Sequence, residues 1–298
     1  ENNLLWSEEL IERYEDKWDW DGLSQNKSLP WSEAFIERFS DRWDWTELSC
    51  NESLPWSEAF IERYEDDWAW IFLSCNESLP WSEAFIERYA DKWHWEYLSG
   101  NESLPWSETL IERYEWNWGE WKSQGSSSEW GESSVRYFSY HDRGLSGNKS
   151  LPWSESLIER YEDKWNWEWL SINESLPWSE ALIERYKDRW NWHEDLNIEN
   201  LNQKLDIKSF DMFYPLPWIT TYSGLTSNES LPWSESLIER YEDKWNWEWL
   251  SINESLPWSE ALIERYKDRW RHWHLRENKS IQKLFNRWTK QEINTALE

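Results

Sequence analysis

Tryptophan recurs at a fixed interval along this chain. It stands at positions 6, 31, 56, 81 and 106, a step of 25 residues each time, and the step returns from Trp153 to Trp178 and from Trp233 to Trp258. The shared text is close to S-L-P-W-S-E-x-[LF]-I-E-R-[YF]-x-D-[KR]-W-x-W-x-x-L-S-x-N. A fixed period of about 20–50 residues is typical of solenoids, in which each unit buries its apolar side against the next. The period therefore predicts an elongated solenoid of about eleven units.

The first half of each repeat has the pattern of an amphipathic helix. In residues 28–51, Ser28 or Ser32 can cap a helix, and Pro30 suits its first turn. The apolar residues from Trp31 to Trp43 follow helical spacing and fall on one side. This pattern predicts a one-sided helix of three turns.

The second half has the chemistry of a short helix and a turn. Asp44 can cap, and Glu47 follows it at capping-box spacing. Trp45 and Leu48 are three residues apart, as suits a single 3₁₀ turn, and Asn51 can form an Asx or left-handed turn. The predicted fold is all-α, with each repeat made of one α-helix, a short 3₁₀ helix and a turn.

Charged residues of the predicted first helix form two rows. Glu33, Glu37 and Asp41 lie on the side opposite the apolar stripe, and Arg38 and Arg42 form a second row. Like charges four residues apart weaken an isolated helix. We therefore expect the acidic row of one repeat to pair with the basic row of its neighbour.

The regular pattern is interrupted twice. Residues 150–190 and 230–270 are identical over 41 positions, which indicates duplication of a whole module. The "LPW" at 216–218 runs on to "LTSN" at 225–228 with only six residues between them, so the helix that normally lies between them is missing from the sequence. The predicted organisation is a regular array at 1–115, a degenerate repeat or loop at 116–144, repeats at 145–192, a degenerate repeat or insertion at 193–227, repeats at 228–278 and a C-terminal capping helix at 279–298.

The repeat resembles two known kinds of sequence. Leu48, Asn51 and the Ser-Leu-Pro-Trp after Asn51 are similar to the turn of the leucine-rich variant class of α-solenoids, which alternate an α-helix with a 3₁₀ turn. Residues 17–26, with Lys-Trp-Asp-Trp followed by Leu-Ser-x-Asn, resemble the largely uncharacterised "KWDW…LSxN" repeats of bacteria and large DNA viruses. The second pattern covers most of the chain. Neither resemblance implies an activity.

Composition restricts the classes of partner. The 33 Trp supply ample apolar area for a core, because an aromatic side chain buries about 150–250 Å². The net charge of −28 argues against binding to a nucleic acid backbone, which needs clustered Lys and Arg. No apolar run approaches the ~20 residues that span a bilayer, so no membrane partner is expected.

The recurring Trp residues have two interpretations. They can pack in the core, or they can form an exposed row that stacks on sugars or bases, or accepts a partner's apolar or cationic side chains. Two Trp that lie two residues apart cannot both face the core within one regular helix, and two repeats carry an additional Trp. The candidates for an exposed aromatic surface are Trp20, Trp45, Trp70, Trp95, Trp167, Trp169, Trp192, Trp247 and Trp249.

Other candidate sites are weaker. Nine Asn-x-Ser triplets are either glycosylation acceptors or parts of the turn, and the turn explains both residues. Cys50 and Cys75 are predicted to be free thiols, because equivalent positions of stacked helices lie about 10 Å apart. His272 and His274 are too few for a zinc site, and the acidic residues lack the spacing of an EF-hand. We find no catalytic motif and expect no cofactor.

These features favour a binding protein over an enzyme. We expect a non-enzymatic, acidic, Trp-rich repeat scaffold that binds another macromolecule, in first place a protein, along an acidic and aromatic surface. Self-association into fibres or layers is the first alternative, and binding of carbohydrate through exposed Trp is the second. The expectation of a scaffold is an analogy with other solenoids.

Overall fold

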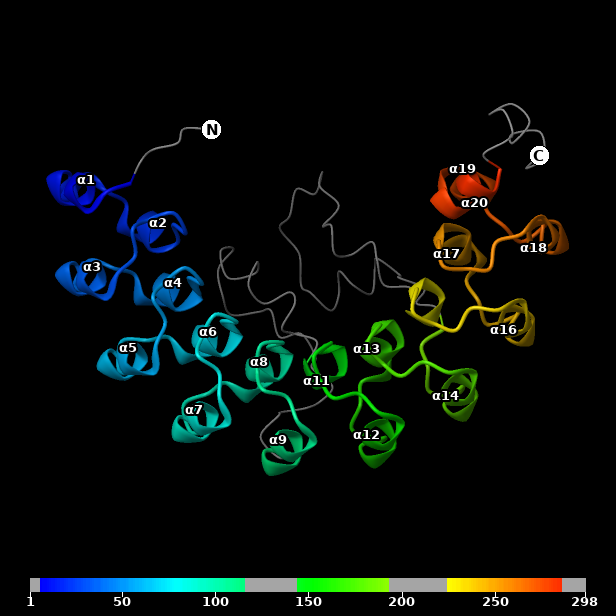
Figure 1. Ribbon diagram of the computed structural model, residues 1–298, viewed down its shortest axis with the longest axis horizontal. Helices are drawn as coiled ribbons and strands as arrows, with labels where there is room; N and C mark the ends of the chain where they lie inside the picture. Colours follow the sequence, from blue (N-terminus) through cyan, green and yellow to red (C-terminus); the bar gives the residue numbers. More distant parts are fainter. Residues whose placement is uncertain (1–5, 116–143, 193–223, 286–298) are drawn as a thin grey trace, which may run out of the picture. The chain divides into compact units, whose positions relative to one another are not determined.

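The chain is an α-solenoid. The computed structural model describes residues 6–115, 144–192 and 224–285, and these ranges contain helices and no strand (Figure 1). The chain divides into two compact units, residues 1–152 and residues 153–298. In the described ranges every helix has six residues or fewer, and none could cross a membrane.

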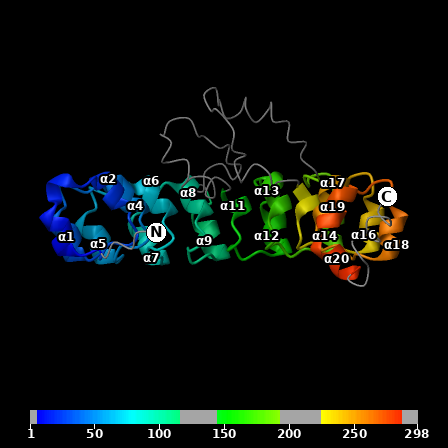
Figure 2. The same cartoon turned by 90° about the horizontal axis from the view of Figure 1, so that it is seen from above.

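Each repeat contributes a first and a second helix. In unit 1 the first helices form one row and the second helices another (Figures 1 and 2). The first helices of unit 1 are α1 (Glu8–Arg13), α3 (Glu33–Arg38), α5 (Glu58–Arg63), α7 (Glu83–Arg88) and α9 (Glu108–Arg113). Its second helices are α2 (Trp20–Ser24), α4 (Trp45–Cys50), α6 (Trp70–Cys75), α8 (Trp95–Gly100) and α11 (Gly144–Gly147), and a short η1 (Glu15–Lys17) follows α1.

Unit 2 has the same two rows. Its first helices are α12 (Glu155–Arg160), α14 (Glu180–Arg185), α16 (Glu235–Arg240) and α18 (Glu260–Arg265). Its second helices are α13 (Trp167–Ile172), η2 (Gly224–Ser227), α17 (Trp247–Ile252) and α19 (His272–Glu277), followed by α20 (Lys279–Leu284). The predicted capping helix at 279–298 is thus described as far as Leu284.

The first helix is shorter than the predicted three turns. Ser32, rather than Ser28, is the N-cap, and its hydroxyl accepts a hydrogen bond from the Phe35 N–H. The helix ends at Arg38, because Phe39 leaves the helical region with φ −119° and ψ 29°. The chain then turns, and the N–H groups of Arg42 and Trp43 both bond to the Phe39 carbonyl.

The second helix is α-helical in most repeats, where the sequence predicted a 3₁₀ turn. Asp44 caps it as predicted, because its carboxylate accepts from the N–H groups of Thr46 and Glu47. The Leu48 N–H then bonds to the Asp44 carbonyl, four residues earlier, at 2.9 Å. This bond is the α-helical pattern, and α6 and α8, which have no side-chain cap, are α-helical as well.

The core repeats with the sequence. Phe35, Ile36, Trp43, Leu48 and Leu54 are at most 5% exposed. The equivalent side chains in the other described repeats are buried as well, except in the first repeat, where those of Phe35 and Trp43 are half-buried. Within the repeat, the ring of Trp43 lies 5.4 Å from that of Phe35, centre to centre. Aromatic pairs at such distances contribute beyond the area that they bury. The apolar stripe therefore faces the core as predicted.

Indole N–H groups satisfy backbone carbonyls throughout the array. Trp31 and Trp45 each donate to a carbonyl five residues earlier, and Trp43 donates to one seven residues earlier, at 2.9–3.1 Å. A six-residue helix leaves most of its carbonyls without a partner inside the helix. Trp supplies both the apolar area and the missing donors, which explains why three Trp recur in each repeat.

Buried Asn and Ser residues join successive repeats. The Asn76 side-chain amide donates to the Ser49 carbonyl at 3.0 Å, and the Ser49 hydroxyl accepts from the Ala69 N–H at 3.0 Å. The Asn76 Oδ1 atom also accepts from the Ser78 N–H, the predicted Asx turn. We call the equivalent residues the asparagine ladder. Its members are Asn51, Asn76, Asn101, Asn148, Asn228, Asn253 and Asn278.

Residues 193–223 interrupt a complete second helix. The Leu225 N–H bonds to the Asn191 carbonyl at 2.7 Å, and the Thr226 hydroxyl donates to the Trp192 carbonyl at 2.6 Å. In α4 the equivalent hydroxyl bond joins residues four apart, whereas here they are 34 apart. Two separate segments of chain are thus joined by the hydrogen bonds of an unbroken second helix. The predicted absence of a helix between 216–218 and 225–228 falls on residues outside the described part of the chain.

Glycine makes this assembly possible. Gly224 has φ +64°, and a Cβ atom there would lie 2.2 Å from the Asn191 carbonyl oxygen. Gly144, which follows the other break, also has a positive φ of 55° and stands at the same repeat position, directly before a buried Leu. Gly144 and Gly224 thus stand at the same point of the repeat, each after one of the two interruptions. Residues 116–143 and 193–223 themselves lie outside the described part of the chain.

Candidate binding surface

Seven of the nine candidate Trp residues lie at the junction between repeats. Trp70 is typical: its N–H donates to the Glu65 carbonyl at 3.1 Å, and its ring lies 4.9 Å from both Tyr89 and Trp93 of the next repeat. Lys92 lies 5.2 Å from the ring centre. The other six residues, each with the equivalent indole hydrogen bond, are Trp20, Trp45, Trp95, Trp167, Trp192 and Trp247.

This position limits their exposure to solvent. Eight of the nine candidates are half-buried, and Trp192 is buried, with 7% of its surface exposed. The expectation of exposure is wrong for Trp192, because its ring packs 4.6 Å from Tyr241 and 4.9 Å from Trp245. The junction rings therefore contribute edges, rather than open faces, to the surface.

Trp169 and Trp249 occupy a different position. Each is the third residue of a second helix, and its backbone N–H bonds to the side chain of the capping Asn166 or Asn246 at 3.3 Å. Both rings are half-buried, and the preceding Glu168 and Glu248 are exposed. These two Trp residues are thus the candidates that lie outside the junctions.

The acidic and basic rows pair between repeats as predicted. Arg63 lies 3.1 Å from Glu33 of the preceding repeat, and Arg88 lies 3.1 Å from Glu58. A second set joins the turns, as in the pair between Arg42 and Glu15 at 3.1 Å. Exposed pairs of this kind are each worth less than ~1 kcal/mol. They fix the register of the first helices and neutralise acidic residues on that side.

The second helices carry the positions that differ most between repeats. The first helices keep a nearly constant sequence, E-x-[LF]-I-E-R, whereas the second and third residues of the second helices change in charge, size and polarity. We call these positions the second-helix face. Its members are Asp21, Gly22, Thr46, Glu47, Ile71, Phe72, Glu96 and Tyr97 in unit 1, and Glu168, Trp169, Glu248, Trp249, Trp273 and His274 in unit 2.

In unit 1 this face has no basic residue. The helices α2, α4, α6 and α8 contain no Lys or Arg. Partial burial of Glu47 raises the pKa of its carboxyl group, and the nearby carboxylates of Asp44 and Asp21 raise it further. The electrostatic surroundings of Glu47 are therefore negative, and they favour a cationic group at this place.

This surface was not predicted from the sequence, because most of its residues are not large aromatic rings. Asp21, Thr46, Ile71 and Glu96 share one repeat column, and no single one of them is unusual. The signal is the variation of that column beside columns that hardly vary. Aligning the repeats and comparing their columns would have identified it.

The described residues include no site that would hold a metal ion. They contain no group of three or more His, Cys, Asp or Glu that could hold a metal ion. Cys50 and Cys75 are free, as predicted, and buried. Burial raises the pKa of the Cys50 thiol well above its usual range, so this thiol is a poor nucleophile.

In most Asn-x-Ser triplets the Asn side chain is buried and hydrogen-bonded within the fold. The ladder members are at most 4% exposed, and each amide donates to a carbonyl of an earlier repeat. A glycan needs that same nitrogen in an accessible place. The role of these Asn residues in the turn therefore accounts for the triplets, which is the second of the two interpretations offered by the sequence.

Comparison with known proteins adds no relative. No family model, curated protein or solved structure matches this chain. The chain itself shows an all-helical layout with Trp and Glu spaced every ~25 residues.

Proposed function

We propose that this protein is a non-enzymatic repeat scaffold that binds another protein through its second-helix face. The observation that carries the proposal is the contrast between the two rows of helices. The first helices are nearly constant, whereas the second helices vary at positions such as Asp21, Thr46 and Ile71. Stacking requires the constant positions, and the variable ones, apart from the buried Phe72 and Tyr97, are available for recognition.

The positions of the two interruptions in the sequence also support binding at the second-helix face. The repeat pattern of the sequence resumes after them at Leu145 and Leu225, which are equivalent positions in second helices. Insertions in repeat proteins often gather on the face that binds a partner. A row of short, tightly joined helices also offers a preorganised surface, which lowers the entropy cost of binding.

The alternatives have less support. Carbohydrate binding through a Trp row needs open ring faces, and the junction rings pack against Tyr and Trp of the next repeat. Assembly into fibres or layers stays a prediction. In the array the acidic charge argues against a nucleic acid partner.

The proposal can be tested with two matched pairs of substitutions. Thr46→Lys with Ile71→Lys changes the second-helix face, and Glu37→Gln with Glu62→Gln changes exposed residues of the first helices. Both double variants raise the net charge by two. Quantitative co-purification from cells that express the tagged chain should show one protein lost from the first variant and kept by the second. Equal retention by both variants would refute the proposed face.

A further inference from the structure

The second helix of the last described repeat, α19, differs in charge from the second helices before it. In the described residues, Lys and Arg are absent from all second helices except α19. Residues 271–285 contain four basic residues, Arg271, Arg276, Lys279 and Lys283, and a single acidic one, Glu277. The chain as a whole has a net charge of −28. Residues 271–285 are therefore locally cationic within an acidic chain.

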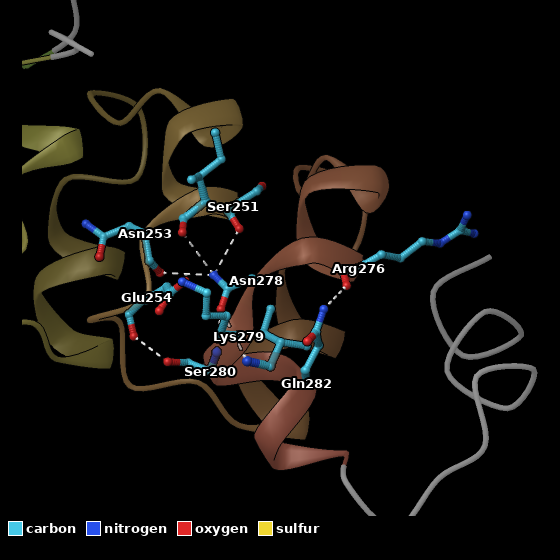
Figure 3. A network of polar contacts seen from close by, with 10 residues as sticks. Ser251, Asn253, Glu254, Arg276, Asn278, Lys279, Ser280 and Gln282 are labelled. Atoms are coloured by element: carbon cyan, nitrogen blue, oxygen red, sulfur yellow. Dashed lines mark hydrogen bonds and ion pairs between the residues drawn. The ribbon is translucent and has the colours of Figure 1, made fainter. Parts of the chain in front are cut away.

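The basic residues lie at the surface. Arg271 is 64% exposed in its side chain and lies 3.8 Å from Glu248, and Lys279 is 75% exposed and lies 3.6 Å from Glu254. Arg276 and Lys283 are exposed, and neither forms an ion pair within the described ranges. Figure 3 shows the Arg276 side chain extending away from the asparagine ladder. Its positive charge is thus open to an anionic partner.

An aromatic ring accompanies these charges. Trp273 is 56% exposed, more than any other large apolar side chain in the described part of the chain. Its ring lies 3.6 Å from that of His274, with an angle of 33° between the planes. Arg276 follows one helical turn later, so the indole and the guanidinium share a side of α19.

The end of a solenoid explains only part of this arrangement. A cap needs polar residues that stop further stacking, and His272 stands where the earlier repeats have their junction Trp. Asn278 still completes the ladder by donating to the carbonyls of Ser251 and Asn253, and Gln282 donates to the Arg276 carbonyl (Figure 3). These contacts secure α19 and α20, and none of them requires an exposed Trp.

We propose that α19 and α20 bind single-stranded nucleic acid, with Trp273 stacking on a base and Arg276, Lys279 and Lys283 contacting phosphates. Proteins that bind single strands combine a cationic groove with aromatic side chains on which bases stack. A partner composed of acidic side chains would satisfy the cations but leave the ring without a flat surface. The combination of an exposed ring and cations therefore favours nucleic acid over an acidic protein.

The acidic remainder of the chain does not prevent this contact. At physiological ionic strength, exposed charges separated by more than ~8 Å are largely screened. The charges beside α19 and α20 then determine local binding, and the four basic residues there outnumber the carboxylates of Glu248, Glu254 and Glu277. The inference is independent of the protein-binding face proposed above.

The test is a titration of the full chain with a fluorescein-labelled 15-nucleotide oligothymidylate, followed by anisotropy. We expect binding in about 50 mM salt and a slope of log K against log salt near −2, because three phosphate contacts to a single strand contribute about −0.7 each. Trp273→Ala should weaken binding about 5- to 100-fold, the range for loss of one stacked base. Circular dichroism confirms that each variant is folded.

Charge reversal gives a matched control. Arg276→Glu with Lys283→Glu should abolish binding, whereas Arg13→Glu with Lys17→Glu, an equal change of net charge at exposed residues of unit 1, should preserve it. Absence of binding in low salt would overturn the proposal, as would equal loss in both double variants. Displacement of the oligonucleotide by a 15-residue polyglutamate at equal concentration would assign the patch to acidic protein instead.

Discussion

The side-chain amide of Asn76 donates a hydrogen bond of 3.0 Å to the backbone carbonyl of Ser49, 27 residues earlier in the chain. Asn76 is 4% exposed, and its Oδ1 atom accepts from the Ser78 N–H at 2.9 Å. One side chain thus closes the turn of its own repeat and bonds to the repeat before it. This relationship recurs along both units and fixes how repeats stack.

Asn76→Ala should destabilise the array. It leaves the buried Ser49 carbonyl without its donor, and an unsatisfied buried group costs about 1–3 kcal/mol. Urea unfolding followed by circular dichroism measures the change. Asn26→Ala is the comparison, because Asn26 is half-buried and, among the described residues, its side chain forms the turn bond to Ser28. Equal losses in the two variants would contradict the role of the ladder.

Asp67→Lys should stabilise the protein. Lys92, at the equivalent position of the next repeat, pairs with Glu65 and lies over the ring of Trp70. Asp67 stands where the other described repeats carry Lys or Arg. A lysine there restores the cation beside Trp45, for a gain of about 0.5–1 kcal/mol.

Thermal unfolding in low and high salt checks this gain. Asp67→Asn is the control, because it removes the negative charge without adding a cation, and it should gain less. The advantage of lysine over asparagine should shrink as salt is added, because exposed charges are screened. If the lysine variant is no more stable than the asparagine variant, the predicted contact between the lysine and the Trp45 ring is refuted.

Glu77→Gln should stabilise the fold at neutral pH. Desolvation raises the pKa of Glu77, and the nearby Glu102 and Glu52 raise it further. An acid whose pKa is higher in the folded state disfavours folding when ionised, and this penalty disappears as the pH falls through that pKa. The melting temperature of the variant should therefore exceed that of the wild type at pH 7 and match it near pH 4.

Glu52 provides the control for this pH dependence. Its carboxylate forms an ion pair with Lys27 at 2.8 Å. Glu52→Gln removes that pair, so it should gain less at pH 7 than Glu77→Gln. If the two variants gain equally, general charge repulsion, rather than the surroundings of Glu77, determines the effect.

Replacing residues 193–224 with Glu-Trp should leave a folded array. The replacement converts the interrupted helix into Asn-Trp-Glu-Trp-Leu-Thr-Ser-Asn, which closely follows the continuous helix α13. Asn191 and Trp192 already bond to Leu225 and Thr226 as in an unbroken helix. Circular dichroism should show retained helicity and a melting temperature within a few degrees of the wild type. A chain that fails to fold would show that the helix is not complete without the segment.

The sequence predicted the architecture because the architecture is periodic. The 25-residue step, the buried stripe, the Asp44 cap and the pairing of Arg63 with Glu33 all follow from residue type and spacing. The length of the first helix did not follow, since the Trp43 indole bonds to the Ile36 carbonyl and helps to end the helix early. Helical spacing alone contains no information about that competing donor.

The candidate site was less predictable. Spacing could not show that the ring of Trp70 packs between Tyr89 and Lys92 of the next repeat, because those contacts depend on how repeats stack. The helix assembled from Trp192 and Thr226 was also hidden, since its two parts are separated by a long insertion. Contacts between repeats, rather than within them, account for both differences.

Photo-crosslinking tests the central proposal, protein binding at the second-helix face, most directly. A benzoylphenylalanine is placed singly at Thr46, Ile71 or Glu168 on this face, and at Glu37 or Glu62 on the first helices. After irradiation in cells that express the protein, mass spectrometry identifies the crosslinked species. We predict that the three face positions capture one common protein and that the two control positions do not. Capture of that protein only from the first helices, or of no protein from the second-helix face, would contradict the proposal.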